Sequence, residues 1–142
     1  MQPVIFADYG NTLDDDIEDS EILLKTLREM KENGATIYLV TGGDNYSARE
    51  AIKKLTKRGY GDLFEGFVSY DTFGQPKSSS EFWPQLLEKY GLNAEDTILL
   101  DDDYSVLRRA LSFGINTVNS LPREEAVEEL RAKYKQISAR PA

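Results

Sequence analysis

The residues of this chain that could carry chemistry are acidic and hydroxyl side chains that directly follow short apolar runs. They are Asp8 after residues 4–7, Thr41 after residues 35–40, and Asp101, Asp102 and Asp103 after residues 97–100. A short apolar run bounded by turn residues is typical of a strand that is buried on both faces. Each polar group therefore stands at the carboxyl end of a predicted strand, which is where open parallel sheets bind their ligands.

The first of these groups, Asp8, has two interpretations when it is considered alone. Gly10 and Asn11 predict a turn just beyond the strand. An acidic residue before such a flexible segment is a candidate nucleophile or metal ligand. Carboxylates that only cap turns are equally common, so the local sequence leaves both interpretations open.

Taken together, the polar groups indicate a more specific chemistry. Carboxylates that converge at one sheet edge repel each other, and a divalent cation such as Mg²⁺, which binds carboxylates, phosphate and water, removes that conflict. Thr41 and the amides of Gly42 and Gly43, at a predicted helix start, can hold phosphate oxygens. Lys77 can neutralise charge on a transferring phosphoryl group. A carboxylate in line with that group can attack it and form an aspartyl-phosphate, so the reaction class is phosphoryl transfer.

The composition excludes several other classes of site. The chain has 142 residues with no histidine and no cysteine, which excludes thiolate nucleophiles, Cys/His zinc sites and Ser-His-Asp triads. A formal net charge of -8 argues against a nucleic-acid-binding surface, which needs a basic face. No apolar stretch approaches the length of a membrane span. We therefore expect a cytoplasmic protein with a single domain, residues 1–142.

The order of the predicted elements indicates how these side chains are positioned. Strands alternate with amphipathic helices, a pattern that predicts an α/β fold with a parallel sheet and helices on both faces. We predict strands at residues 4–7, 35–40, 67–70, 97–100 and 115–118. The apolar faces of the helices between and after them include Leu24, Leu55, Trp83, Leu107, Leu111 and Leu130.

Caps and loops complete this prediction. Asp19 or Ser20 is expected to cap the first helix, and Ser79 or Ser80 the helix that contains Trp83. Ser120 and Pro122 are expected to open the last helix. The acidic segment 14–19 reads as a solvated loop, and residues 138–142 as a frayed tail.

These residues resemble the four motifs of the haloacid dehalogenase-like (HAD) superfamily, over roughly Val4 to Val118. Residues 8–13, Asp-Tyr-Gly-Asn-Thr-Leu, are similar to the first motif, an Asp followed by a second acid and Gly-Thr-Leu. Thr41 resembles the second motif and Lys77 the third. Asp101 and Asp102, with a glycine and a strand downstream, resemble the fourth. The motifs stand in the family's order, each at the end of the corresponding element.

The resemblance implies a Rossmann-like domain with sheet order 3-2-1-4-5, a bound Mg²⁺ and a phosphorylated substrate. Asp8 would be the nucleophile and a metal ligand, together with the backbone carbonyl of Gly10 and the carboxylate of Asp102. Which of the acids 101–103 ligates the metal stays open, with Asp101 the second candidate. Thr41 and Lys77 would hold the phosphoryl group, and Asn11 and Gly42 belong to the expected substrate-binding set.

Two positions depart from the family's pattern. The second acid, two residues after the nucleophile, is Gly10 here, so no side chain can protonate a leaving group or activate water there. Such acid–base help is worth about 10²–10⁴-fold in rate. The fourth motif often holds a further acid at a position that is Val106 here, and Asp101 or Asp103 is a candidate replacement for that acid.

Two functions follow from these patterns. One is a Mg²⁺-dependent phosphohydrolase or phosphotransferase that acts through an aspartyl-phosphate on Asp8. The other is a degenerate relative that binds a phosphorylated ligand or a protein partner without turnover. A helix and a strand fill each segment flanking Thr41, so we expect no cap domain. That favours an open site that admits a large substrate or is closed by a partner.

Overall fold

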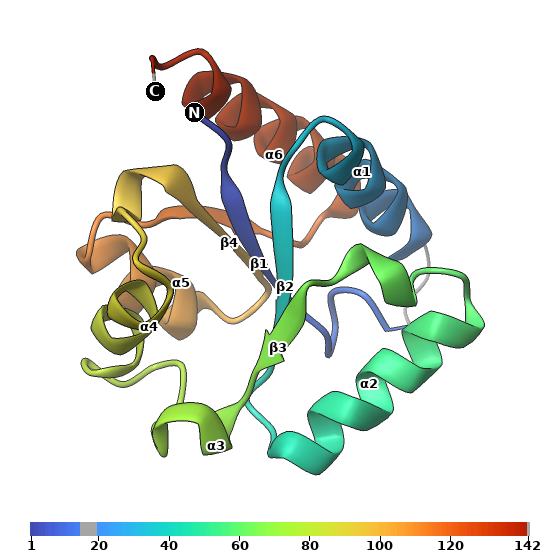
Figure 1. Ribbon diagram of the computed structural model, residues 1–142, viewed down its shortest axis with the longest axis vertical. Helices are drawn as coiled ribbons and strands as arrows, with labels where there is room; N and C mark the ends of the chain where they lie inside the picture. Colours follow the sequence, from blue (N-terminus) through green and yellow to red (C-terminus); the bar gives the residue numbers. More distant parts are fainter. Residues whose placement is uncertain (15–19, 142) are drawn as a thin grey trace.

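The computed structural model describes residues 1–14 and 20–141 and contains a five-stranded parallel sheet between two layers of helices (Figure 1). The strand order is β3-β2-β1-β4-β5. The strands are β1 (Val4–Asp8), β2 (Thr36–Val40), β3 (Gly66–Val68), β4 (Thr97–Asp101) and β5 (Asn116–Asn119). The helices are α1 (Ser20–Glu32), α2 (Asn45–Lys57), α3 (Tyr70–Phe73), α4 (Phe82–Tyr90), α5 (Tyr104–Ser112) and α6 (Arg123–Ser138), with 3-10 turns η1 (Gly61–Leu63) and η2 (Ala94–Asp96). The predicted fold class and strand order are confirmed.

The central strands are apolar on both faces because each face meets a layer of helices. In β1, Ile5 and Ala7 belong to the core formed with α1, α2 and α6, whereas Phe6 belongs to the core formed with α4 and α5. Figure 1 shows these two layers on opposite sides of the sheet. Successive strand residues point to opposite faces, so a strand covered on both sides needs an uninterrupted apolar run.

This strand order brings the candidate site residues to one edge of the sheet. Asp8 is in register with Val40, the last residue of β2, so Thr41 follows at the same level. Ala7 is in register with Leu100, which places Asp101 beside Asp8. The chain moves outward from β1 in one direction through β2 and β3, and in the other through β4 and β5. The crevice at such a reversal is where open α/β sheets bind ligands.

The third strand was predicted two residues too long. It ends at Val68, and Ser69 is the N-cap of the short helix α3, which sequence reasoning missed. The Ser69 side chain accepts a hydrogen bond from the backbone of Thr72, and the Thr72 side chain accepts one from the backbone N–H of Ser69. A serine that satisfies a helix N-terminus in this way ends the strand before Tyr70.

Two helix details were also predicted wrongly. The cap position of α4 is Glu81, and Ser79 instead accepts a hydrogen bond from the Glu81 N–H at 3.0 Å, within the preceding turn. Leu111 is 59% exposed rather than part of the apolar face of α5. It follows the fully buried Ala110, and neighbouring helical residues point about 100° apart.

Two predicted segments, the loop after β1 and the tail, lie partly outside the described residues. The expected acidic loop, apart from Asp14, and the expected cap Asp19 lie outside the described residues, and α1 begins at Ser20. At the other end, α6 continues to Ser138, and Arg140 forms an ion pair with Asp96. Among the described helices, none is long and apolar enough to cross a membrane.

Candidate active site

Lys77 joins the two carboxylates at the ends of the central strands. Its Nζ atom lies 2.8 Å from Asp8 Oδ1 and 2.7 Å from Asp101 Oδ2. All three side chains are buried, and Asp101 is buried completely. Asp8 is 69 positions from Lys77 in sequence and Asp101 is 24 positions from it, yet all three side chains meet at one point.

The backbone that carries Lys77 is held in place by two hydrogen bonds. The fully buried Trp83 donates from Nε1 to the carbonyl oxygen of Lys77 at 2.8 Å. Arg109 donates from Nε to the carbonyl oxygen of the next residue, Ser78, at 3.0 Å. The prediction that Trp83 packs in the core is confirmed, and its indole N–H also connects that core to the site.

Burial and neighbouring charges change the proton affinity of these groups. Burial raises the pKa of Asp8 to about 7, because the opposing effect of Lys77 is partly cancelled by the charges of Asp101 and Asp102. Burial alone would lower the pKa of Lys77, but the carboxylates of Asp8 and Asp101 outweigh it, and its pKa is raised. One ammonium group therefore serves a site with three carboxylates, which leaves an excess of negative charge.

The acids differ in their freedom to bind a cation. One oxygen from each of Asp8, Asp101 and Asp102 lies within 4.8 Å of the others. Both Asp101 oxygens are already acceptors, from Lys77 and from the N–H of Asp103. Asp103 itself caps α5 by accepting from backbone N–H groups. Asp102 is half-buried and has no described partner. This set of hard oxygen donors fits Mg²⁺, with Asp8 and Asp102 the carboxylates best able to bind it.

The segment after β2 lies against Lys77. A Cβ atom added at Gly42 would stand 3.9 Å from Lys77 Cε. Thr41 donates its N–H to the carbonyl of Val68 at 2.9 Å, and its Oγ1 accepts from the Gly43 N–H at 3.1 Å. The helix α2 starts two residues later and has 13 residues. Residues 41–43 therefore stand just before a helix N-terminus, which favours anions.

The turn after Asp8 leaves room at the position of the missing acid. Asn11, not Gly10, has the left-handed backbone conformation, with φ 59°. A Cβ atom added at Gly10 would meet no atom within 4 Å. The Asn11 side chain is exposed, and the backbone carbonyl oxygen of Asn11 accepts a hydrogen bond from Arg123.

Sequence reasoning missed three buried polar residues in and around the turn that follows Asp8. Thr12 Oγ1 lies 3.5 Å from Asp8 Oδ2, a long contact, and 3.0 Å from Ser120 Oγ. Arg123 donates to the carbonyl oxygens of Asn11 at 2.9 Å and of Thr12 at 3.4 Å. Ser120 and Arg123 come from the β5–α6 connection, more than 100 residues along the chain. No local pattern marks them, because each is an ordinary residue near a helix start.

Comparison with known sequences gives one family. Residues 6–110 match the model of the haloacid dehalogenase-like hydrolases. The chain is 33% identical over 89 residues to the GMP/IMP nucleotidase YrfG of Escherichia coli, covering 63% of this chain and 39% of that protein. It is 30% identical over 99 residues to the glyceraldehyde 3-phosphate phosphatase of Methanocaldococcus jannaschii, covering 69% and 42%. The chain thus spans about two fifths of the length of these relatives.

Solved structures share the fold at lower sequence identity. An uncharacterized protein from Corynebacterium glutamicum superposes with a TM-score of 0.76 at 21% identity, covering 95% of this chain and 96% of the other. CbbY from Rhodobacter sphaeroides, in complex with phosphate, superposes with a TM-score of 0.66 at 11% identity, covering 84% and 86%. At these identities the likeness concerns the arrangement of sheet and helices.

Proposed function

The chain belongs to the haloacid dehalogenase-like hydrolase family, and from this premise we propose that it is a Mg²⁺-dependent phosphohydrolase acting through an aspartyl-phosphate on Asp8. The observation that carries the proposal is the bridge from Lys77 to Asp8 and Asp101 at the sheet edge. Residues 41–43 lie at the same edge, as does Asp102, which has no partner among the described residues. A purely structural ion pair would not need a further carboxylate and the start of a helix beside it.

In the proposed reaction, a carboxylate oxygen of Asp8 attacks the phosphorus of a phosphomonoester. The new bond joins Asp8 Oδ to phosphorus, and the bond from phosphorus to the leaving oxygen breaks with its electron pair. Water then attacks the phosphorus of the aspartyl-phosphate, which releases inorganic phosphate and restores the carboxylate. A covalent intermediate of this kind divides one difficult displacement into two easier ones.

The other groups of the site have supporting roles. Lys77 has three N–H donors, of which two are used by Asp8 and Asp101, so the third can donate to a phosphoryl oxygen. The hydroxyl of Thr41 and the N–H of Gly42 can hold further phosphoryl oxygens. Asp8, Asp102 and the carbonyl of Gly10 would hold Mg²⁺, which when bound supplies positive charge that stabilises phosphoryl oxygens.

Gly10 limits the substrates that this site can cleave well. No side chain at this position can protonate a leaving oxygen, so we expect turnover to favour leaving groups that depart as stable anions, such as aryl and acyl phosphates. The role of Asn11 in substrate binding remains our expectation; its exposed side chain lies next to this turn.

Exposed aromatic residues at the same edge support a large substrate. Tyr46, Tyr70 and Tyr104 lie in the first turns of α2, α3 and α5, the helices that follow β2, β3 and β4. They are 68%, 44% and 69% exposed. Tyrosine at a rim supplies contact area at little cost in side-chain entropy. We propose a cytoplasmic role on phosphorylated substrates whose leaving group is large enough to reach this rim.

The test is a panel of phosphates assayed with and without Mg²⁺. The panel contains p-nitrophenyl phosphate and acetyl phosphate. It also contains GMP, IMP and glyceraldehyde 3-phosphate, the compounds in the names of the two relatives. We expect Mg²⁺-dependent release of phosphate, strongest for the first two. Asp8→Asn should lower this to background and abolish binding of beryllofluoride, whereas Asp62→Asn, at an exposed carboxylate outside the site, should change neither. Activity retained in Asp8→Asn would refute the mechanism.

A binding role without turnover is distinguished by the same experiment. Gly10 is the residue that favours this second candidate. A binding role predicts that beryllofluoride and phosphate bind in an Asp8- and Mg²⁺-dependent manner, while no member of the panel is hydrolysed.

A further inference from the structure

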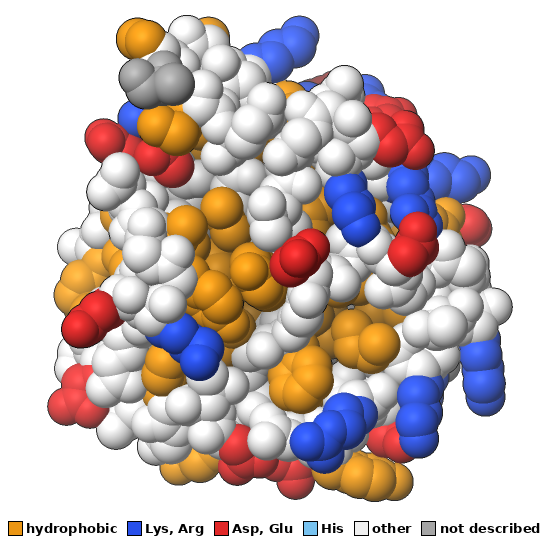
Figure 2. Space-filling model, viewed as in Figure 1, with side chains coloured by type: hydrophobic (Ala, Val, Ile, Leu, Met, Phe, Trp, Pro, Cys, Tyr) orange, Lys and Arg blue, Asp and Glu red, His pale blue; other side chains and the backbone are white. Residues whose placement is uncertain are grey.

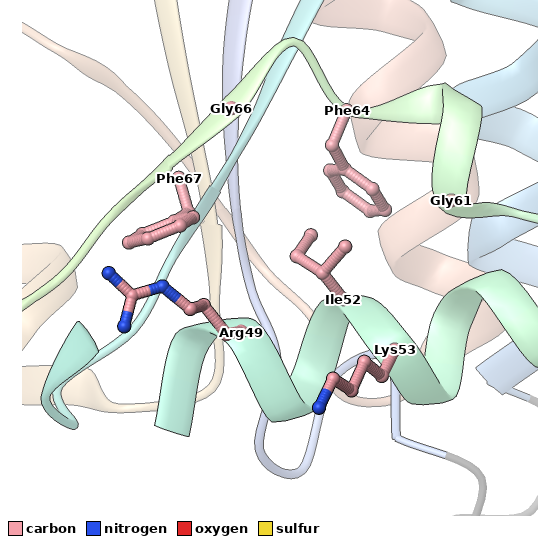
Figure 3. Close-up of a pocket in the computed structure, with 7 residues that line it drawn as sticks. All are labelled: Arg49, Ile52, Lys53, Gly61, Phe64, Gly66 and Phe67. Carbon is pink, nitrogen blue, oxygen red and sulfur yellow. The ribbon is translucent and has the colours of Figure 1, made fainter. Parts of the chain in front are cut away.

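A hollow of about 340 Å³ lies between the outer side of α2 and the edge strand β3, and no residue of the candidate active site lines it (Figure 3). Arg49, Ile52 and Lys53 border it from α2, and Phe64 and Phe67 from the segment that enters and forms β3. Its volume is at the lower end of the range of small-molecule pockets, about 300–1,000 Å³.

The walls of the hollow are mainly apolar. Ile52, Phe64 and Phe67 are half-buried, and each packs against the edge of the large core. In Figure 3 the side chains of Phe64 and Ile52 face each other at one end, while the ring of Phe67 lies above the guanidinium of Arg49 at the other. Figure 2 shows apolar side chains exposed in the middle of this face, with basic side chains over α2. A ring-sized apolar group would find three side chains to pack against here.

The charged groups at the hollow are both positive. Lys53 pairs with Glu50 at 3.2 Å in an exposed contact along the helix. Arg49 makes no hydrogen bond, ion pair or ring contact within the described part of the chain. No carboxylate is among the lining residues. In a chain with a formal charge of -8, an unpaired guanidinium above an apolar hollow is complementary to an anion.

We propose that this hollow is a second ligand site, which binds a small carboxylic acid with an aromatic or branched apolar body. The body packs among Ile52, Phe64 and Phe67, and the carboxylate accepts hydrogen bonds from Arg49. A guanidinium presents two parallel N–H donors that match a carboxylate, which makes Arg49 the group that selects an acid over a neutral molecule. The burial of one ring supplies most of the affinity.

The site is separate from the phosphoryl site but rests on the same two elements. The helix α2 begins just after residues 41–43, and Val68 of β3 accepts the N–H of Thr41. An acid in the hollow contacts α2 at Arg49 and Ile52, more than one helical turn after residues 41–43. It therefore binds together with phosphate rather than in competition with it.

The experiment titrates the ¹⁵N-labelled protein with 3-phenylpropionate and follows backbone amide shifts. We expect saturable shifts for residues of α2 and β3 around the hollow, also with phosphate present. The neutral 3-phenylpropionamide and the ringless propionate should both bind more weakly. Arg49→Gln should lower the affinity for the acid about three- to fivefold, the effect of one partly exposed charge pair, and leave the affinity for the amide unchanged.

Matched controls make the result decisive. Lys57→Gln removes a cation from the same helix but outside the hollow and should not change the affinity. Equal affinity for acid and amide, equal weakening by both substitutions, or no saturable shift would overturn the proposal. Tighter binding of N-acetyl-Gly-Gly-Phe than of the free acid would also overturn it, because the hollow would then be a groove for a chain end.

Discussion

Asp8 should give the metal-free protein an unusual dependence of stability on pH. A buried carboxyl with a raised pKa keeps a proton in the folded state that the unfolded state has already lost. For Asp8 this interval extends from the ordinary value of 3.8 to about 7. The free energy of unfolding should therefore fall as the pH rises towards 7, which is opposite to the behaviour of a salt-bridged carboxylate.

The magnitude follows from the width of this interval. Well inside this interval each pH unit changes the free energy of unfolding by about 1.4 kcal/mol, and the slope halves at its upper limit, so raising the pH from 5 to 7 should cost roughly 2 kcal/mol. Other shifted groups act outside this window. The lowered pKa values of Asp44, Asp62 and Asp103 give stability that is lost only as the pH falls below 4. The raised pKa of Lys77 gives stability that is lost only above about 10.5. The chain has no histidine.

Urea denaturation at pH 5, 6, 7 and 8, in the presence of a chelator, measures this effect. Asp8→Asn cannot titrate and should flatten the profile in this range. Asp102→Asn removes one of the charges that raise the pKa of Asp8, so the decline should persist but be smaller and end at lower pH. A wild-type free energy of unfolding that is constant or rises with pH, or an equal decline in Asp8→Asn, would refute the reasoning.

Three further predictions concern the metal, the missing acid and the support of Lys77. Millimolar Mg²⁺ should raise the melting temperature, because a Mg²⁺ concentration of 100 times the dissociation constant adds about 2.7 kcal/mol to the free energy of unfolding. Asp102→Asn should abolish this gain and Asp103→Asn should retain it. Gly10→Asp should fold normally, since nothing lies within 4 Å of its new Cβ, and should speed hydrolysis of an alkyl phosphate about 10²-fold or more. A folded variant without that gain would show that the acid is not limiting. Trp83→Phe removes the hydrogen bond to the Lys77 carbonyl and should cost about 1–3 kcal/mol in urea denaturation, with a lower kcat. Unchanged stability and kcat would contradict that role.

The sequence by itself determined the fold and the edge at which chemistry is expected. Uninterrupted apolar runs require a sheet covered on both faces, and their alternation with amphipathic helices requires parallel strands. Asp8, Thr41 and the acids 101–103 could therefore be placed at one sheet edge without coordinates. Where sequence reasoning was wrong, as at Ser69 and Leu111, the error concerned a cap or the limit of an apolar face, where one residue can satisfy two local structures.

Only the tertiary structure decided which of these side chains face one another. Asp101 and Asp102 are equivalent in sequence, but adjacent residues at a strand end point in different directions. Asp101 is therefore fully buried against Lys77, whereas Asp102 is half-buried and has no partner in the described part of the chain. Other features join segments that are far apart in the chain. They are the contacts of Ser120 and Arg123 with the turn after Asp8, and the hollow that Arg49 lines. No local pattern encodes such contacts, because they depend on how the whole sheet and its helices pack.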